Sequence, residues 1–202
     1  MRTRRPRRIL KNFQARLQGI AQKHPGKRLE LWTQDEARFG QQGTLARVWA
    51  ARGSRPNAPR QTQYGWVYLF AAVCPLSGQT HAWLMPYVNT TAMNFFLETF
   101  AKTLASNVHV VMMLDRAGWH RSHSLRVPAN VTLLYLPPKS PRLNPSEWPW
   151  RECRQKHLAN RILRTDEDIY AAVGDAWNKL TSNPKTIQSL CGFDWILSAL
   201  RN

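Results

Sequence analysis

Apolar and polar residues follow a period of two along the first half of the chain, which predicts an antiparallel meander of three strands. The segment Leu29–Asp35 alternates, so that Asp35 shares a face with the apolar positions before it. The run Trp66–Cys74 is almost wholly apolar and predicts a buried strand, and Thr80–Met85 is expected to return as its hairpin partner across a Pro-Leu-Ser-Gly turn. The Gly- and Arg-rich stretch from Phe39 to Arg60 is expected to form a hairpin and loop.

The pattern then changes to alternating helices and strands. A helix capped by Thr90 or Thr91 carries apolar residues at helical spacing. The segment Val108–Leu114 is apolar throughout and predicts a central strand covered on both faces, and Val131–Leu136 predicts another strand. Together with the meander, this order predicts an α/β fold with a mixed sheet and helices on both faces.

Helices are also expected at the two ends of the chain and after a proline-rich loop. Apolar residues from Ile9 to Ile20 recur at roughly helical spacing, and His24-Pro25-Gly26 ends that helix. The loop 137–145 leads into a helix from about Ser146 to His157. Thr165 is expected to cap a last amphipathic helix, helped by Asp168 three residues on.

Positive charge is the strongest signal of the composition. The 202 residues include 29 Lys and Arg against 12 Asp and Glu, a formal net charge of +17. Such an excess raises the energy of a compact chain unless a polyanion offsets it, and nucleic acid is the polyanion that we expect. A ribosome-associated or merely basic soluble protein is the plainer alternative.

Membrane insertion, secretion and disulfide chemistry are not expected. The longest apolar stretch, near Trp66–Pro75, is too short to cross a bilayer, and the N-terminus lacks the apolar core of a secretory signal. Cys74, Cys153 and Cys191 are widely spaced and show no paired-ligand pattern, so we expect reduced thiols in the cytosol.

Carboxylates are scarce in the middle of this chain, which makes their positions informative. Between Ala37 and Ser146 the only acidic residues are Glu98 and Asp115. Asp115 directly follows an apolar strand, as Asp35 does, and Glu147 begins a helix. Each alone could be a helix cap or a salt-bridged side chain. Three carboxylates that meet repel one another, so their convergence would imply bound cations.

Four motifs stand out in order along the chain. They are Trp32–Gly40, then Arg47–Ala50 with Gly53–Pro56, then Leu114–His120, and finally Leu136–Pro141 running into Leu143–Glu147. Together they resemble the DDE transposases of the insertion-sequence 630 family, the bacterial branch of the Tc/mariner superfamily. The resemblance implies a ribonuclease H-like fold with a five-stranded mixed sheet. It also implies three parts: a basic arm and helix at 1–28, a catalytic core at 29–160 and a helical extension at 161–202. The first part would be the remnant of, or the linker from, an N-terminal helix-turn-helix region.

The same resemblance assigns the catalytic and metal-binding acids to Asp35, Asp115 and Glu147. Their oxygen ligands suit Mg²⁺ or Mn²⁺, and two ions would activate the attacking oxygen and stabilise the leaving one. Glu36 alternates to the other face of its strand and is interpreted as structural or salt-bridged. Arg116 and Trp148-Pro149-Trp150 depart from the family pattern beside the second and third acids.

DNA is the expected partner, both as transposon ends and as target, with a homodimer assembled on it in the bacterial cytoplasm. The candidate DNA contacts are Arg47, Trp49, Arg52, Arg55, Lys139 and Arg142. His120 and His123 lack further ligands for a zinc site, and the resemblance places Trp119 and His120 at the edge of the active site.

Two other functions remain open from the sequence. One is a DNA-binding remnant that keeps the fold and has lost turnover. The other is a ribonuclease H-like nuclease acting on RNA or hybrids, which the transposase motifs and the missing fourth acid disfavour. Ser140, Ser146 and Cys153 have no evident base partner, which argues against nucleophilic catalysis by a side chain.

Overall fold

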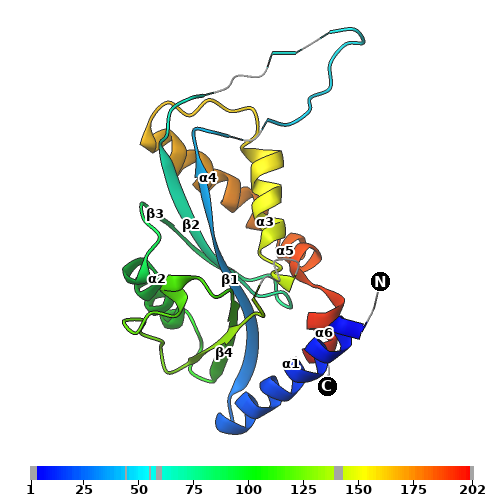
Figure 1. Ribbon diagram of the computed structural model, residues 1–202, viewed down its shortest axis with the longest axis vertical. Coiled ribbons are helices and arrows are strands. Elements are labelled where there is room, and N and C mark those ends of the chain that lie inside the picture. The colour runs from blue at the N-terminus through cyan, green and yellow to red at the C-terminus, as the bar shows by residue number, and fades with distance from the viewer. Residues whose placement is uncertain (1–3, 44, 55, 58–60, 139–142, 201–202) are drawn as a thin grey trace.

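The computed structural model contains a five-stranded mixed sheet with helices on both faces (Figure 1). It describes residues 4–43, 45–54, 56–57, 61–138 and 143–200, with the backbone alone for 4–12. The strands are β1 (Arg28–Gly40), β2 (Trp66–Val73), β3 (Thr80–Met85), β4 (Val108–Leu114) and β5 (Val131–Tyr135). Their spatial order is β3-β2-β1-β4-β5.

Strand β1 lies at the centre of the sheet and joins its two halves. It pairs antiparallel with β2, which pairs antiparallel with β3, so the predicted meander is confirmed. On its other side it pairs parallel with β4, which pairs parallel with β5. Every residue of β4 is buried, as its continuous apolar sequence predicts.

The alternation along the strands divides the core into two layers. On one face Trp32, Phe70 and Met112 pack with apolar residues of α2 (Thr90–Lys102). On the other face two clusters form. One is built with α4 (Asp166–Thr181) and α5 (Pro184–Cys191), and the other with α1 (Arg4–Lys23) and α6 (Asp194–Leu200).

The helix after the proline-rich loop differs from its prediction. It consists of α3 (Glu147–Glu152) followed by one π-helical segment, η3 (Cys153–His157). In this segment the Leu158 N–H donates to the Cys153 carbonyl at 3.0 Å. One extra residue is thereby accommodated before Leu158 returns to the core.

Two further details correct the sequence predictions. The cap of α2 is Asn89, whose side chain accepts from the N–H of Ala92, rather than Thr90 or Thr91. The chain from 161 on contains three helices where only α4 was expected, although Thr165 and Asp168 do form the predicted capping box. The division at residues 28 and 160 stays a prediction, and the structure packs Phe13 of α1 and Trp177 of α4 into the core.

The segment between β1 and β2 forms no hairpin in its described part. Strand β1 instead continues to Gly40 because Ala37 and Phe39 still alternate into the core and Gly40 still pairs with Trp66. Beyond it the described parts of residues 41–65 project from the body as an irregular arm (Figure 1). Within the part of the chain that is described, no helix is long and apolar enough to cross a membrane.

Candidate active site

Asp35 lies on central strand β1 and is held by two donors, one in the loop before α3 and one within α3. Asn144 Nδ2 and Trp150 Nε1 both donate to Asp35 Oδ2 at 3.0 Å. Trp150 belongs to the core cluster beneath, where only 2% of its surface is exposed. The rigid ring therefore fixes the position of this carboxylate relative to α3.

The loop before α3 is tied to β1 by a second pair of contacts. The hydroxyl groups of Thr33 and Ser146 lie 3.0 Å apart, and the backbone N–H of Ser146 donates to Asn144 Oδ1 at 3.2 Å. Ser146 is the residue before Glu147, so these contacts set where α3 begins. Pro149 stands in the first turn, where a proline costs no intrahelical hydrogen bond.

Asp115 follows the end of β4 and is bound on its Oδ1 atom by two groups. The backbone N–H of Ala117 lies 2.8 Å away and His120 Nδ1 lies 2.9 Å away. His120 sits in η1 (Gly118–His120) and is fully buried, whereas the side chain of Asp115 is 53% exposed. One oxygen of the carboxylate is thus held by hydrogen bonds, while the side chain remains accessible to solvent.

Glu36 completes a chain of contacts with His120 and Asp115. Its Oε1 lies 2.9 Å from His120 Nε2 and also accepts from Gln34 Nε2 at 3.0 Å and Trp119 Nε1 at 3.3 Å. The interpretation of Glu36 as a salt-bridged residue is confirmed by this geometry. Because both nitrogens of the His120 ring face carboxylate oxygens, the ring donates twice and is an imidazolium.

The electrostatics of the two aspartates differ. Burial raises the pKa of Asp35 to about 7, and the nearby carboxylates of Glu36 and Glu147 add to the rise. The hydrogen bond from His120 lowers the pKa of Asp115 below its ordinary value. Burial opposes the charge of His120, but its hydrogen bonds with Asp115 and Glu36 outweigh burial and raise its pKa to about 9.

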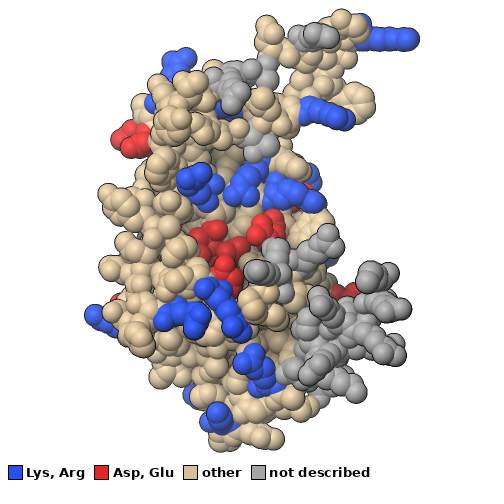
Figure 2. Space-filling view, in the orientation of Figure 1, with Lys and Arg blue, Asp and Glu red and all other residues tan. Residues whose placement is uncertain are grey.

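The acids gather on one face of the molecule. Figure 2 shows acidic side chains clustered in a depression there and bordered by Lys and Arg. Asp35 interacts electrostatically with Glu147 and Glu36, and Asp115 is connected to Glu36 through His120. That Asp35, Asp115 and Glu147 approach within metal-bridging distance stays a prediction.

The donor set fits a hard divalent cation in its chemistry. Carboxylate oxygens are the ligands that Mg²⁺ and Mn²⁺ prefer, and the like charge that helps raise the pKa of Asp35 is what a cation would relieve. Among the described residues no three His, Cys, Asp or Glu side chains are already arranged around one metal position.

The structure also bears on the disfavoured zinc alternative and on the two departures from the family pattern. His120 binds carboxylates rather than forming a ligand pair with His123, which is exposed. Arg116 Nε donates to the Leu136 carbonyl at 3.0 Å, which ties the end of β4 to the segment after β5. In Trp148-Pro149-Trp150, it is the third residue that contacts Asp35.

Only some of the predicted DNA contacts lie within the described residues. Arg47, Trp49 and Arg52 are exposed on the irregular arm, where the ring of Trp49 touches nothing that shields it from solvent. Arg55, Lys139 and Arg142 lie outside the described residues. Their roles stay predictions.

Sequence reasoning missed several side chains around the acids. Asn144 and Trp150 lie within or just after a quoted motif, but nothing in the sequence said that both would reach Asp35. Arg38, Arg151 and Arg154 were also missed. The spacing of the last two from Glu147, at four and seven residues on the expected helix, was the available signal.

Comparison with known proteins decides the family. The profile of the family described as DDE superfamily endonuclease matches residues 30–170. The chain belongs to this family. A protein of Sinorhizobium fredii (strain NBRC 101917 / NGR234), described as uncharacterized protein y4pE/y4sA, is 42% identical over 130 residues, which are 64% of this chain and 96% of that protein.

Solved structures share the fold of this DDE endonuclease domain. The Mos1 mariner paired-end complex with Mn matches with a TM-score of 0.65 at 16% identity, covering 95% of this chain and 60% of that chain. The catalytic domain of Mos1 mariner transposase matches with a TM-score of 0.52 at 15% identity, covering 96% of each chain. The chain thus spans about 60% of the whole transposase chain and nearly all of its catalytic domain.

These findings confirm the predicted ribonuclease H-like fold and the predicted DDE endonuclease domain. The similarity to Mos1 is consistent with the Tc/mariner resemblance, whereas the narrower insertion-sequence 630 assignment stays a prediction.

Proposed function

We propose that the protein is the catalytic domain of a transposase, which cleaves DNA strands and joins them to new sites by in-line displacement at phosphodiesters. The observation that carries the proposal is the placement of Asp35, Asp115 and Glu147 on the central strand, at the end of its parallel neighbour and at the start of α3. A net charge of +17 around this acidic centre suits a polyanionic substrate.

Asp35, Asp115 and Glu147 would hold Mg²⁺ or Mn²⁺, in the proposal two ions. When bound, the ions activate the attacking water or 3′-hydroxyl and stabilise the departing oxygen. Mos1 paired-end complexes have been solved with Mn and with Mg, which supports this choice of metal.

The chain's own contribution is to present oxygens of fixed position. Asn144 and Trp150 orient the Asp35 carboxylate through its Oδ2 atom. Ala117 and His120 hold Asp115 Oδ1 and leave its exposed side toward solvent. Such preorganisation places the charge before the substrate arrives, so less reorganisation is needed during the reaction.

The wider assignments belong to the same proposal. Duplex DNA, as element ends and target, would be the substrate, since the Mos1 structures include a complex with a transposon end. The proposal also includes a homodimer on DNA, membership of the insertion-sequence 630 branch, and a place in the bacterial cytoplasm at the nucleoid. It further includes DNA contacts through Arg47, Trp49, Arg52, Arg55, Lys139 and Arg142.

The decisive experiment is isosteric removal of each acid. Asp35→Asn, Asp115→Asn and Glu147→Gln should each lower Mn²⁺-dependent nicking of supercoiled DNA by at least about a hundredfold, because each removes charge from the site. DNA binding should be equal or tighter, since a negative charge is lost.

Exposed Glu98→Gln is the matched control and should nick as the wild type does. Wild-type protein that binds DNA without nicking it would indicate the inactive remnant. Preferential cleavage of RNA–DNA hybrids would indicate the other ribonuclease H-like nuclease.

A further inference from the structure

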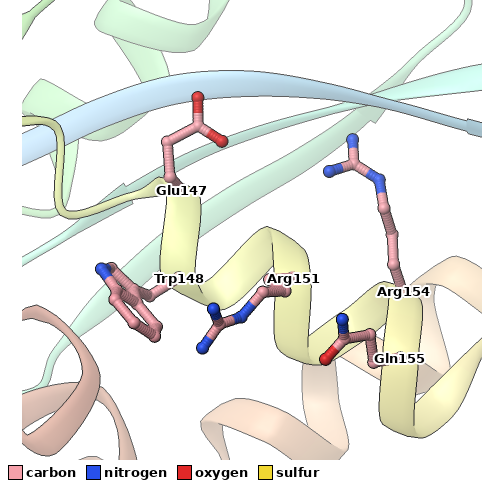
Figure 3. A pocket seen from close by; sticks show the side chains of 5 residues that line it. All are labelled: Glu147, Trp148, Arg151, Arg154 and Gln155. Atoms are coloured by element: carbon pink, nitrogen blue, oxygen red, sulfur yellow. The ribbon is translucent and has the colours of Figure 1, made fainter. Parts of the chain in front are cut away.

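A groove runs along α3 away from the third acid. It encloses about 330 Å³ and is lined by Glu147, Trp148, Arg151, Arg154 and Gln155 (Figure 3). A smaller hollow of about 50 Å³ also has Arg154 in its wall and adds Arg38 and Arg161. We call the two hollows together the arginine groove. It leads from the acids toward the base of the irregular arm.

Three of these arginines are supported by aromatic rings. Arg151 Cζ lies 3.8 Å from the ring centroid of Trp148, Arg154 Cζ lies 5.0 Å from that of Phe39, and Arg38 Cζ lies 5.3 Å from that of Trp66. A guanidinium over a ring keeps its N–H edge free for a ligand and loses less side-chain entropy when it binds one. The rings of Trp148 and Trp66 are exposed, so this support is built at the surface.

The groove arginines are also uncompensated. In the described part of the chain, none of Arg38, Arg151, Arg154 and Arg161 forms an ion pair with a carboxylate. On the same helical stretch Lys156 does so, at 2.5 Å from Glu152. The positive charge of the groove therefore remains available to an external anion.

We propose that the arginine groove binds the phosphates of one DNA strand where that strand leaves the acids along α3. The inference rests on the proposed function for the identity of the polyanion. Arg151 and Arg154 follow Glu147 by four and seven residues, roughly 6 and 10 Å along a helix. That distance is on the scale of contacts with neighbouring phosphates of one strand. The aromatic support suits repeated phosphate contacts, which carry no sequence information.

Neutralising single basic residues on β1 and on the continuous stretch α3–η3 provides a matched test. Arg38→Gln, Arg151→Gln and Arg154→Gln should each weaken binding of mixed-sequence duplex DNA about tenfold at low salt, as loss of a charged hydrogen bond does. Each should also reduce the slope of log affinity against log salt by about 0.9. Lys156→Gln removes the same charge from the same stretch but should change affinity less than about twofold, because Glu152 already neutralises that lysine. Equal effects of Arg151→Gln and Lys156→Gln would overturn the proposal.

Neutral backbone linkages locate the contact. Single methylphosphonates at successive positions on one side of a fixed nick should weaken wild-type binding at two or three neighbouring linkages. Arg151→Gln should be insensitive to one of them, since the same contact cannot be lost twice. If the losses from the Arg151→Gln substitution and from the methylphosphonate add at every linkage, the assignment is contradicted. It is also contradicted if a polyglutamate peptide binds the arginine groove and DNA does not compete with it.

The inference and the proposed function can fail separately. If the wild type never nicks DNA with Mn²⁺ but the groove variants still lose affinity and slope, the function fails and the phosphate site stands. If the wild type nicks and the groove variants bind DNA as it does, the phosphate site fails and the function stands.

Discussion

At the scale of single residues, Asp35 occupies a position that a free carboxylate tolerates poorly. Its ordinary pKa of 3.8 rises to about 7 because it is buried beside Glu36 and Glu147. In metal-free protein its ionisation therefore costs free energy. Because the folded pKa is the higher one, the folded state loses stability as the pH rises from about 4 to about 7.

Asp35→Asn should consequently stabilise the metal-free protein at pH 7.5 and leave its stability at pH 4 nearly unchanged. The pKa difference corresponds to up to about 4 kcal/mol in the free energy of unfolding. Urea unfolding in EDTA at pH 4, 5.5 and 7.5 measures it, with exposed Asp175→Asn as the control. A variant that is no more stable than the wild type at pH 7.5 would show that Asp35 is not strained in this way.

His120 differs from Asp35, because the folded protein favours the charged form of His120 and disfavours that of Asp35. It bridges Asp115 and the nearly buried Glu36, and these hydrogen bonds raise its pKa to about 9. A raised histidine pKa contributes stability that is fully present below pH 6.5 and is lost as the pH rises through 9.

His120→Asn should therefore destabilise the protein by about 3 kcal/mol at pH 6, because it leaves Glu36 buried without its cation. At pH 10 the loss should be smaller, since the wild-type ring is then neutral as well. Chemical denaturation at the two pH values tests this, and exposed His123→Asn should be silent at both. Equal destabilisation by His120→Asn at pH 6 and pH 10 would argue for lost packing alone.

At the scale of elements, the sequence predicted what depends on local periodicity. Strands β2, β3 and β4 begin and end close to their predicted positions because their apolar patterns are unbroken. The length of β1 and the cap at Asn89 were not predictable in the same way, since pairing with Trp66 and competition among neighbouring polar residues decide them.

The site followed the same division. Asp115 could be predicted as a strand-end carboxylate, and Glu147 from the resemblance. Asp35 was also predicted at a strand end, but it lies within β1 because that strand continues to Gly40. The His120–Glu36 contact joins residues 84 positions apart, and the Trp150–Asp35 contact joins residues 115 apart. A single sequence holds no periodic signal for such pairs, so only the folded chain reveals them.

The base of the irregular arm is fastened by Gln41, a buried side chain with several partners. Its Oε1 accepts from the Gly65 N–H at 2.7 Å, and its Nε2 donates to the Leu163 carbonyl at 3.0 Å and to Gln63 Oε1 at 3.1 Å. One residue thus joins both ends of the arm to the segment before α4.

Gln41→Ala should lower the free energy of unfolding by about 2 kcal/mol, because it leaves Gly65 and Leu163 backbone groups unpaired. It should also speed proteolysis within residues 42–64, as measured by mass spectrometry of early fragments. Exposed Gln42→Ala is the control. Unchanged cleavage in the Gln41 variant would show that other contacts hold the arm.

At the scale of the whole molecule, an acidic depression lies in a strongly basic protein (Figure 2). The basic surface attracts a polyanion, while the acids at its centre would repel each phosphate unless a cation lies between them. Stability, metal binding and DNA binding should therefore be thermodynamically linked.

Mn²⁺ should raise the thermal midpoint of the wild type, with about 2.7 kcal/mol of added stability at a hundredfold excess over its dissociation constant. Glu147→Gln should largely lose this shift, whereas Glu98→Gln on α2 should keep it. Melting curves in EDTA and in Mn²⁺ provide the measurement. An unchanged wild-type midpoint at metal concentrations that support nicking would exclude the linkage.

The π-helical segment η3 sets the rotational phase of everything that follows α3. Each residue of an α-helix turns the chain by about 100°, and the hydrogen bond from Leu158 to Cys153 spans five residues instead of four. The extra residue lets Leu158 reach the core. It also directs the chain toward Leu163 and the base of the arm. Deleting one residue from 153–157 would restore a regular helix but turn that exit by about 100°. The number of residues between Trp150 and Leu163 is therefore constrained as strictly as the types of those residues.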